Sequence, residues 1–158
     1  MKYWLVATYK INEIKQVEAN LKNQGFDYYL PKIFTKKPNC KPHEEAMFPG
    51  YIFINASIGR YSSVKYTKGI KNIIKFGENI SYMTDSEIKS ITKAEKLTML
   101  EPILSDIKIG QEVDIKSGAF KGNIGRICAL PSGERVGILL HFLGAKRKIN
   151  ILKKDILF

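Results

Sequence analysis

Cysteine, histidine and long apolar runs are all scarce in this chain of 158 residues. Its two cysteines, Cys40 and Cys128, are far apart and lack a paired motif, so a disulfide framework is not supported and a reducing compartment fits better. No stretch of eighteen apolar residues occurs, and the first residues form no long apolar core. We therefore expect a cytoplasmic protein with neither a signal peptide nor a membrane-spanning helix.

Residue types suited to catalysis or metal binding are not placed to act together. His43 and His141 have no partner at metal-ligand spacing, and Glu44 and Glu45 are adjacent residues of a polar loop. A lone histidine is more often structural or solvated than catalytic. We therefore expect no enzyme activity, no metal and no other cofactor.

Acidic side chains are absent from residues 46–77, although the chain carries 15 of them elsewhere. Five cations fall inside this window of 32 residues: Arg60, Lys65, Lys68, Lys71 and Lys75. With a net charge of +11 and a pI near 9.6, the chain is suited to a polyanionic partner. A solvated lysine-rich face would have a similar composition, but the complete absence of acids favours a basic patch for phosphate.

Apolar periodicity predicts an α/β sandwich in the N-terminal part, with one antiparallel sheet covered by helices. We expect strands over residues 3–9, 26–31, 51–54 and 70–76, a loop or hairpin tip over 35–46, and helices over 13–24, 60–68 and from 85 onward. Asn12 is expected to cap the first helix, and Gly25 suits the position after its end. The run Thr84-Asp85-Ser86-Glu87 is typical of a capping box, which would start the last helix.

The second half of the chain has a different pattern, because glycines recur among alternating apolar residues. The positions that carry this pattern are Gly110, Gly118, Phe120, Gly122 and Gly125. Such spacing indicates a small, strongly bent β-barrel. A phosphate-cradling loop is the competing interpretation, but no Gly-Lys-Ser/Thr follows. We therefore expect an α+β chain with an N-terminal domain (1–96), a linker interrupted by Pro102 (97–107) and a barrel domain (108–158).

The most informative short segment is Met47-Phe48-Pro49-Gly50-Tyr51-Ile52-Phe53. A Pro-Gly turn is followed by a strand, whose period places Tyr51 and Phe53 on one face and Ile52 and Ile54 on the other. Aliphatic residues on one face and aromatic residues on the opposite face suit a sheet with a core side and a docking side. The alternative is a strand that is buried on both faces.

This segment resembles the Leu-Phe-Pro-Gly-Tyr-[Ile/Leu]-[Phe/Val] segment of the N-terminal domain of NusG-family transcription elongation factors. The glycine-rich run is similar to the KOW motif, the small barrel that follows this domain in the family. Within the family, Thr67-Lys68-Gly69-Ile70 and Gly118-Ala119-Phe120-Lys121-Gly122 most resemble the RfaH subfamily of operon-specific antitermination factors. The resemblance implies a factor that binds RNA polymerase and suppresses pausing.

The resemblance also implies two polymerase contacts. Tyr51 and Phe53, with Phe48 beside them, would bind the clamp helices of the largest subunit. A second set would contact the gate loop of the second-largest subunit: Arg60, Tyr61, Ser62 and Ser63. Closing the gap between the two subunits would oppose clamp opening, since a ligand favours the state that it binds better.

A DNA contact is implied as well, to the single-stranded non-template strand. The corresponding residues here are Lys10, Gln16, Asn20, Asn23, Gln24, Lys68 and Lys71. Gln16, Asn20 and Asn23 stand where the RfaH subfamily has Arg, His and Arg, so we expect a different sequence preference. The barrel would contact ribosomal protein S-ten, and the chain is expected to act as a monomer.

Two other functions remain open. One is a general NusG-type elongation factor coupled to Rho or to the ribosome, and the other is a KOW RNA-binding module of the ribosome or of translation. The second would leave the N-terminal domain unexplained.

Residues 136–143 fit two structures. If the segment is a strand, one of its faces carries Val136, Ile138, Leu140 and Phe142, and the other carries Leu139 and Leu143. A strand of a small barrel needs only one apolar face, so the two leucines are surplus. A neighbouring strand or loop could cover these two leucines. Alternatively, the segment also forms a helix that packs on the N-terminal domain and masks Tyr51 and Phe53, as the switch of the RfaH subfamily between a barrel and a helical hairpin implies.

Overall fold

The computed structural model describes residues 2–36, 39–100, 103–104 and 132–156. Its contacts divide the chain into two compact units. The first unit is built from Met1–Leu30 and Pro49–Asp85, with Lys146–Phe158 counted with it, and the second from Pro31–Phe48 and Ser86–Ala145.

The first unit contains a sheet in which every strand pair is antiparallel, as the sequence predicts. Its strand order is β2-β5-β1-β6, and β9 also pairs with β1. The strands are β1 (Lys2–Tyr9), β2 (Asp27–Tyr29), β5 (Tyr51–Ser57), β6 (Ile70–Ile73) and β9 (Tyr82–Met83), and β7 (Lys75–Phe76) with β8 (Asn79–Ile80) forms a separate two-stranded sheet. Because β1 is bonded to β5 on one side and to β6 and β9 on the other, it lies inside the sheet.

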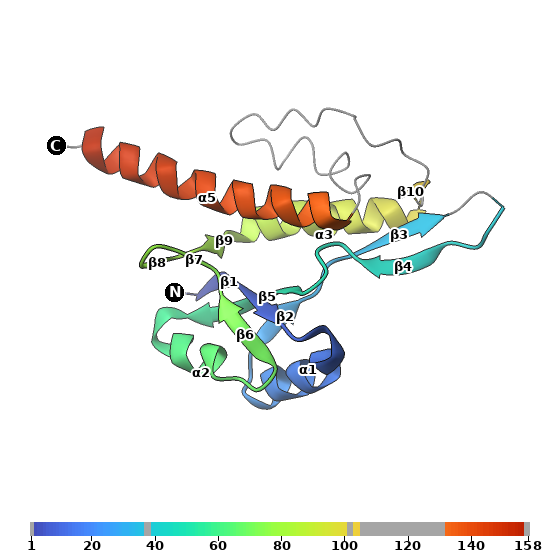
Figure 1. The fold of residues 1–158 in the computed structure, drawn as a ribbon, viewed down its shortest axis with the longest axis horizontal. Helices are drawn as coiled ribbons and strands as arrows, with labels where there is room; N and C mark the ends of the chain where they lie inside the picture. Colours follow the sequence, from blue (N-terminus) through green and yellow to red (C-terminus); the bar gives the residue numbers. More distant parts are fainter. Residues whose placement is uncertain (1, 37–38, 101–102, 105–131, 157–158) are drawn as a thin grey trace. The chain divides into compact units, whose positions relative to one another are not determined.

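Two helices cover one face of this sheet, α1 (Ile14–Asn23) and α2 (Tyr61–Lys65) (Figure 1). Ile52 and Ile54 of β5 pack in one cluster with Val17 and Leu21 of α1 and Val64 of α2. The predicted stripe of α1 and the aliphatic face of β5 are therefore both confirmed, because alternate strand residues share a face and residues three or four apart share a helix face.

The start of α1 differs from the prediction, and its end agrees with it. The chain enters the helix through a 3₁₀ turn, η1 (Ile11–Glu13), and no side chain caps it, so the expected cap by Asn12 is wrong. At the other end Gly25 has φ = 77°, and the N–H groups of Gly25 and Phe26 donate to Lys22 O and Leu21 O. This is the Schellman arrangement, in which glycine adopts the left-handed conformation after the helix at little steric cost.

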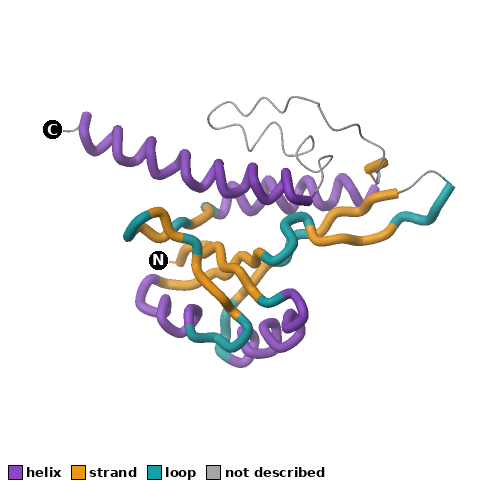
Figure 2. The backbone as a smooth tube through the Cα atoms, viewed as in Figure 1, coloured by secondary structure: helices purple, strands orange, loops and turns teal. Residues whose placement is uncertain are grey.

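The second unit contains a hairpin of β3 (Lys32–Lys36) and β4 (His43–Ala46), drawn as two orange strands in Figure 2. The strand β10 (Ile103–Leu104) pairs with β3 in parallel. Helix α3 (Asp85–Leu100) begins where the capping box predicts and buries Ile88, Ile91 and Ala94. The helix extends to Leu100, and so occupies the first four residues of the segment expected as a linker.

Residues of the second half form a long helix, α5 (Ser132–Ile156), instead of the barrel strand expected over 136–143. Arg135, Leu139 and Leu143 are buried, and their spacing of four places them on one helix stripe. The helix thus gathers the two leucines that would lie on the wrong face of a strand. The KOW positions, Gly110, Gly118, Phe120, Gly122 and Gly125, lie outside the described residues. Among the helices that are described, none is both long enough and apolar enough to cross a bilayer.

Candidate nucleic-acid interface

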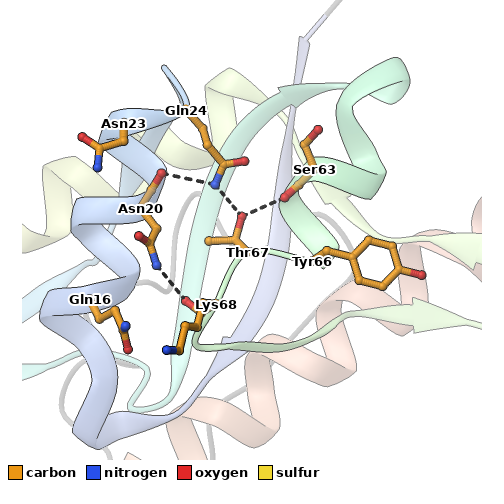
Figure 3. A pocket seen from close by; sticks show the side chains of 8 residues that line it. All are labelled: Gln16, Asn20, Asn23, Gln24, Ser63, Tyr66, Thr67 and Lys68. Atoms are coloured by element: carbon orange, nitrogen blue, oxygen red, sulfur yellow. Dashed lines mark hydrogen bonds between the residues drawn. The ribbon is translucent and has the colours of Figure 1, made fainter.

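A polar pocket of about 480 Å³ opens on the first unit between α1 and the turn that follows α2. We call it the amide pocket, because four of its eight lining residues are Asn or Gln (Figure 3). The lining residues are Gln16, Asn20, Asn23, Gln24, Ser63, Tyr66, Thr67 and Lys68. Five of the seven predicted DNA-binding residues are among them, although they come from segments that are more than forty residues apart.

Hydrogen bonds between side chains and backbone hold the two walls of the amide pocket together. Gln24 Nε2 donates to Thr67 Oγ1 at 2.9 Å and to Asn20 O at 3.2 Å. The Thr67 hydroxyl donates in turn to Ser63 O at 2.8 Å. Asn20 Nδ2 donates to Lys68 O at 3.3 Å, so α1 is tied to the turn at two places.

Gly69 ends this turn and lies directly against α1. Its φ is 97°, and a Cβ added there would overlap Cγ2 of the fully buried Val17. The Gly69 carbonyl accepts a hydrogen bond from the N–H of Lys10 at 3.0 Å. Only glycine permits both this positive φ and the close approach of the Gly69 backbone to Val17. The position of the neighbouring Lys68 on the pocket wall therefore depends on Gly69.

The five cations of the acid-free window are all exposed, and all lie on the first unit. Among the described residues none of the five makes an ion pair. Lys65 and Lys75 lie over the Tyr66 and Tyr61 rings, with Nζ at 5.6 and 5.0 Å from the ring centroids. Exposed cations without acidic partners can bind phosphate, and the neighbouring rings can stack on bases.

The remaining predicted DNA residues, Lys10 and Lys71, are exposed but do not line the pocket. Lys10 is joined through its N–H to the same turn that carries Lys68. Tyr66 and Thr67 line the pocket and were not predicted. Tyr66 could have been suspected, because an exposed aromatic residue within a basic window is a common feature of nucleic-acid surfaces.

The predicted gate-loop contact forms the turn η2 (Ile58–Arg60) and the start of α2. Arg60 Nη2 donates to Gln24 O at 2.8 Å, and its guanidinium lies 4.0 Å from the centroid of the Phe26 ring. Ser62 and Ser63 are exposed, and Ser63 belongs to the wall of the amide pocket. Arg60 therefore supports the end of α1, and the exposed Ser62 and Ser63 add two hydroxyls to the accessible surface of this segment.

The aromatic face of β5 is not exposed as expected. Phe53 is completely buried, Phe48 is 1% exposed and Tyr51 is half-buried. The Phe53 ring lies 6.4 Å from that of Tyr29, and its partner across β1 is the buried Val6. The strand is thus buried on both faces between Ile52 and Ile54. The expectation of two exposed rings is wrong for this conformation, because strand period assigns a face but does not determine what covers it.

In the second unit, α5 is fixed to the end of β4 by one buried arginine, an arrangement that we call the hairpin lock. Arg135 is 3% exposed, and its Nε donates to Met47 O at 2.7 Å. Its Nη2 donates to Ala46 O at 3.2 Å and lies 3.3 Å from Glu45 Oε1. The sequence did not predict this contact, since nothing in a single arginine next to the segment 136–143 indicates a buried partner 90 residues away.

Comparison with known proteins gives a family match and a similar solved structure. The family model described as "NusG: Transcription termination factor nusG" matches residues 2–92, which is more than half of the chain. A solved structure titled "Domain interaction in Thermotoga maritima NusG" is 19% identical, with 75% of this chain and 70% of that chain covered and a TM-score of 0.44. No curated protein matches the chain.

Proposed function

The chain belongs to the NusG family of transcription factors, and from that premise we propose that it is an operon-specific elongation and antitermination factor. In this proposal it binds the clamp helices of RNA polymerase through the aromatic face of β5 and the non-template DNA strand through the amide pocket. The observation that carries the proposal is the gathering of five predicted DNA-binding residues into one exposed pocket, beside cations that have no acidic partner among the described residues.

The DNA contact is supported by charge and by access. Lys68 on the pocket wall and the other window cations are exposed and make no ion pair within the described part of the chain. Neutralising phosphates with such cations provides most of the sequence-independent affinity for DNA. The neutral amides between these cations can then contact the edges of the bases. Such contacts can distinguish one base from another, whereas phosphate contacts cannot.

The polymerase contact requires a conformational change in this proposal. Phe53 is buried here, so the ring has to become accessible before it can bind another protein. Helix α5, which the hairpin lock fixes next to Met47 and Phe48, is the element that we propose to move. Release of α5, with the formation of a KOW barrel by the C-terminal domain (108–158), would then accompany recruitment. The barrel would be free to contact ribosomal protein S-ten.

A polymerase pull-down tests the polymerase contact. It compares wild-type protein with Tyr51→Ala, with Phe53→Leu and with the double variant. Phe53→Leu is preferable to alanine, because truncating a fully buried Phe to Ala would cost about 3–5 kcal/mol of folding stability. We expect the double variant to lose polymerase while it remains folded, with an unfolding temperature below that of wild type because buried apolar volume is lost. Leu97→Ala, which shortens a 55% exposed apolar residue of α3, is the matched control and should bind normally. Retention of polymerase by the folded double variant would refute the clamp contact.

A general NusG-type factor is the second candidate, because the matching family model is that of NusG itself. Genome-wide occupancy separates the two candidates. An operon-specific factor should occupy a few transcription units downstream of a shared DNA element, whereas a general factor should follow polymerase over most genes.

A further inference from the structure

Three side chains form a row across the sheet of the first unit, on the face that carries Phe53. Asn55 of β5 is paired with Asp27 of β2 on one side and with Trp4 of β1 on the other. Residues directly opposite each other in antiparallel strands point to the same face, and Asn55 follows Phe53 by two positions. We call Asp27, Asn55 and Trp4 the Asn55 row.

Asn55 in the middle of this row has a polar atom without a partner. Among the described side chains, Asn55 Oδ1 is the buried polar atom that makes no hydrogen bond. A buried acceptor without a donor has lost its hydration and gained nothing in exchange, so it disfavours the conformation that buries it. The proposed polymerase contact requires Phe53 on the same face to become accessible, and that rearrangement would also open the Asn55 amide to a partner.

Asp27 adds a negative charge beside this amide. Its side chain is exposed and makes neither an ion pair nor a hydrogen bond with the described residues, although the chain has 26 basic residues. Its strand β2 is the edge of the sheet, so no further strand covers Asp27 from that side. Directly opposite residues have Cβ atoms about 5 Å apart, so a single donor group can reach both Asp27 and Asn55.

Trp4 adds an aromatic ring on the other side of Asn55. Its Nε1 donates to Asp85 Oδ1 at 2.8 Å, which holds the indole in one orientation. A carboxylate, an amide oxygen and an aromatic ring are the groups with which a guanidinium interacts best, because it is planar, has five N–H donors and stacks on rings. A lysine ammonium has a single charged centre and matches this row less well.

We propose that the Asn55 row binds an arginine side chain of RNA polymerase once the β5 face is uncovered. The guanidinium donates to the Asp27 carboxylate and to Asn55 Oδ1, and the Trp4 ring lies beside it. This inference rests on the proposed polymerase contact and adds a charge-selective contact to the aromatic one. The same Asn55 oxygen disfavours the covered conformation, so it favours both the release of the face and the binding of its partner.

The charge of Asp27 gives the cleanest test, because its side chain contacts no described partner. The full-length chain is immobilised and titrated with core RNA polymerase at several salt concentrations. Asp27→Asn should bind about tenfold more weakly at low salt and with a shallower salt dependence, since one charged hydrogen bond is lost. Glu78→Gln removes the same charge from another exposed acid of the first unit and is the matched control, which should bind as wild type does.

Asn55→Leu tests the amide with a side chain of similar size. Removal of the unsatisfied oxygen should raise the unfolding temperature by a few degrees, whereas polymerase binding should weaken. The double variant with Asp27→Asn should lose less affinity than the product of the two single losses, because both residues contact one arginine. If Asn55→Leu fails to fold, the comparison of Asp27→Asn with Glu78→Gln decides.

The outcomes separate this contact from the proposed function. Polymerase binding by wild type, with equal affinity in folded Asp27→Asn and Asn55→Leu, would overturn the arginine contact while the polymerase contact stands. Losses that multiply in the double variant would overturn the shared arginine. A wild-type chain that does not bind polymerase would remove the proposed function and this inference together.

Discussion

The amide pocket of the first unit and the hairpin lock of the second use their polar groups in opposite ways. In the pocket, the NH₂ groups of Asn20 and Gln24 donate hydrogen bonds to backbone carbonyls, and their carbonyl oxygens remain open to solvent. In the hairpin lock, the buried Arg135 donates hydrogen bonds to Met47 O and Ala46 O and pairs with the Glu45 carboxylate. The first arrangement leaves acceptors open to a ligand, whereas the second holds α5 at the end of β4.

This difference separates two kinds of binding. A DNA strand could enter the amide pocket without any rearrangement of the described residues. A partner that needs Phe53, in contrast, binds only the fraction of molecules in which that ring is exposed, so its apparent affinity is reduced by that fraction.

The largest effect is expected from Arg135→Ala, which removes the hairpin lock. Two backbone carbonyls lose a charged donor in a buried site, and we expect the docking of α5 to weaken by about 3 kcal/mol. Hydrogen exchange of the α5 amides should accelerate, and polymerase binding should become tighter under the proposed function. Glu45→Gln is the graded control, because Glu45 is 39% exposed, so that solvent screens its charge, and both carbonyl contacts of Arg135 remain in this variant. Equal effects of the two variants would mean that the ion pair, and not the carbonyl contacts, holds α5.

A smaller effect is expected from Gly69→Ala, which tests the packing of the pocket wall. A left-handed conformation costs an L-residue about 1–2 kcal/mol, and the overlap with Val17 adds to this. Chemical denaturation should therefore show a loss of at least about 2 kcal/mol, accompanied by weaker single-stranded DNA binding. Gly59→Ala is the matched control, since its added methyl group meets no atom within 4 Å, and it should stay within about 0.5 kcal/mol. A neutral Gly69→Ala would show that α1 and the turn can separate without cost.

The smallest effect is expected from Lys68→Ala on the salt dependence of DNA binding. Losing one phosphate contact should reduce the slope of log K against log salt by about 0.7 for a single strand, and the affinity should fall at low salt. Lys93→Ala removes the same charge from an exposed position on α3 and should leave the slope unchanged. Equal slopes for Lys68→Ala and wild type would place the phosphate contact elsewhere.

Local patterns predicted most of the first unit. The glycine after α1, the start of α3 at Asp85 and the aliphatic face of β5 depend on residues close in sequence, and all three are confirmed. The prediction of a cap by Asn12 also depended on neighbouring residues, but it is wrong because a 3₁₀ turn stands where the helix was expected to start. Resemblance to a family, rather than composition, supplied the list of residues from which the amide pocket is built.

The chain's sequence by itself determined the strand and helix periods, the acid-free basic window and the amide and lysine side chains that DNA would meet. Only the tertiary structure decided that Asn20 and Gln24 present acceptors, that Phe53 is covered and that residues 136–143 are helical. The physical reason is that period fixes the face on which a side chain lies, whereas its burial and its hydrogen bonds depend on groups brought to it from distant parts of the chain. A segment that is apolar at both periods, as 136–143 is, can therefore take its conformation from what it packs against.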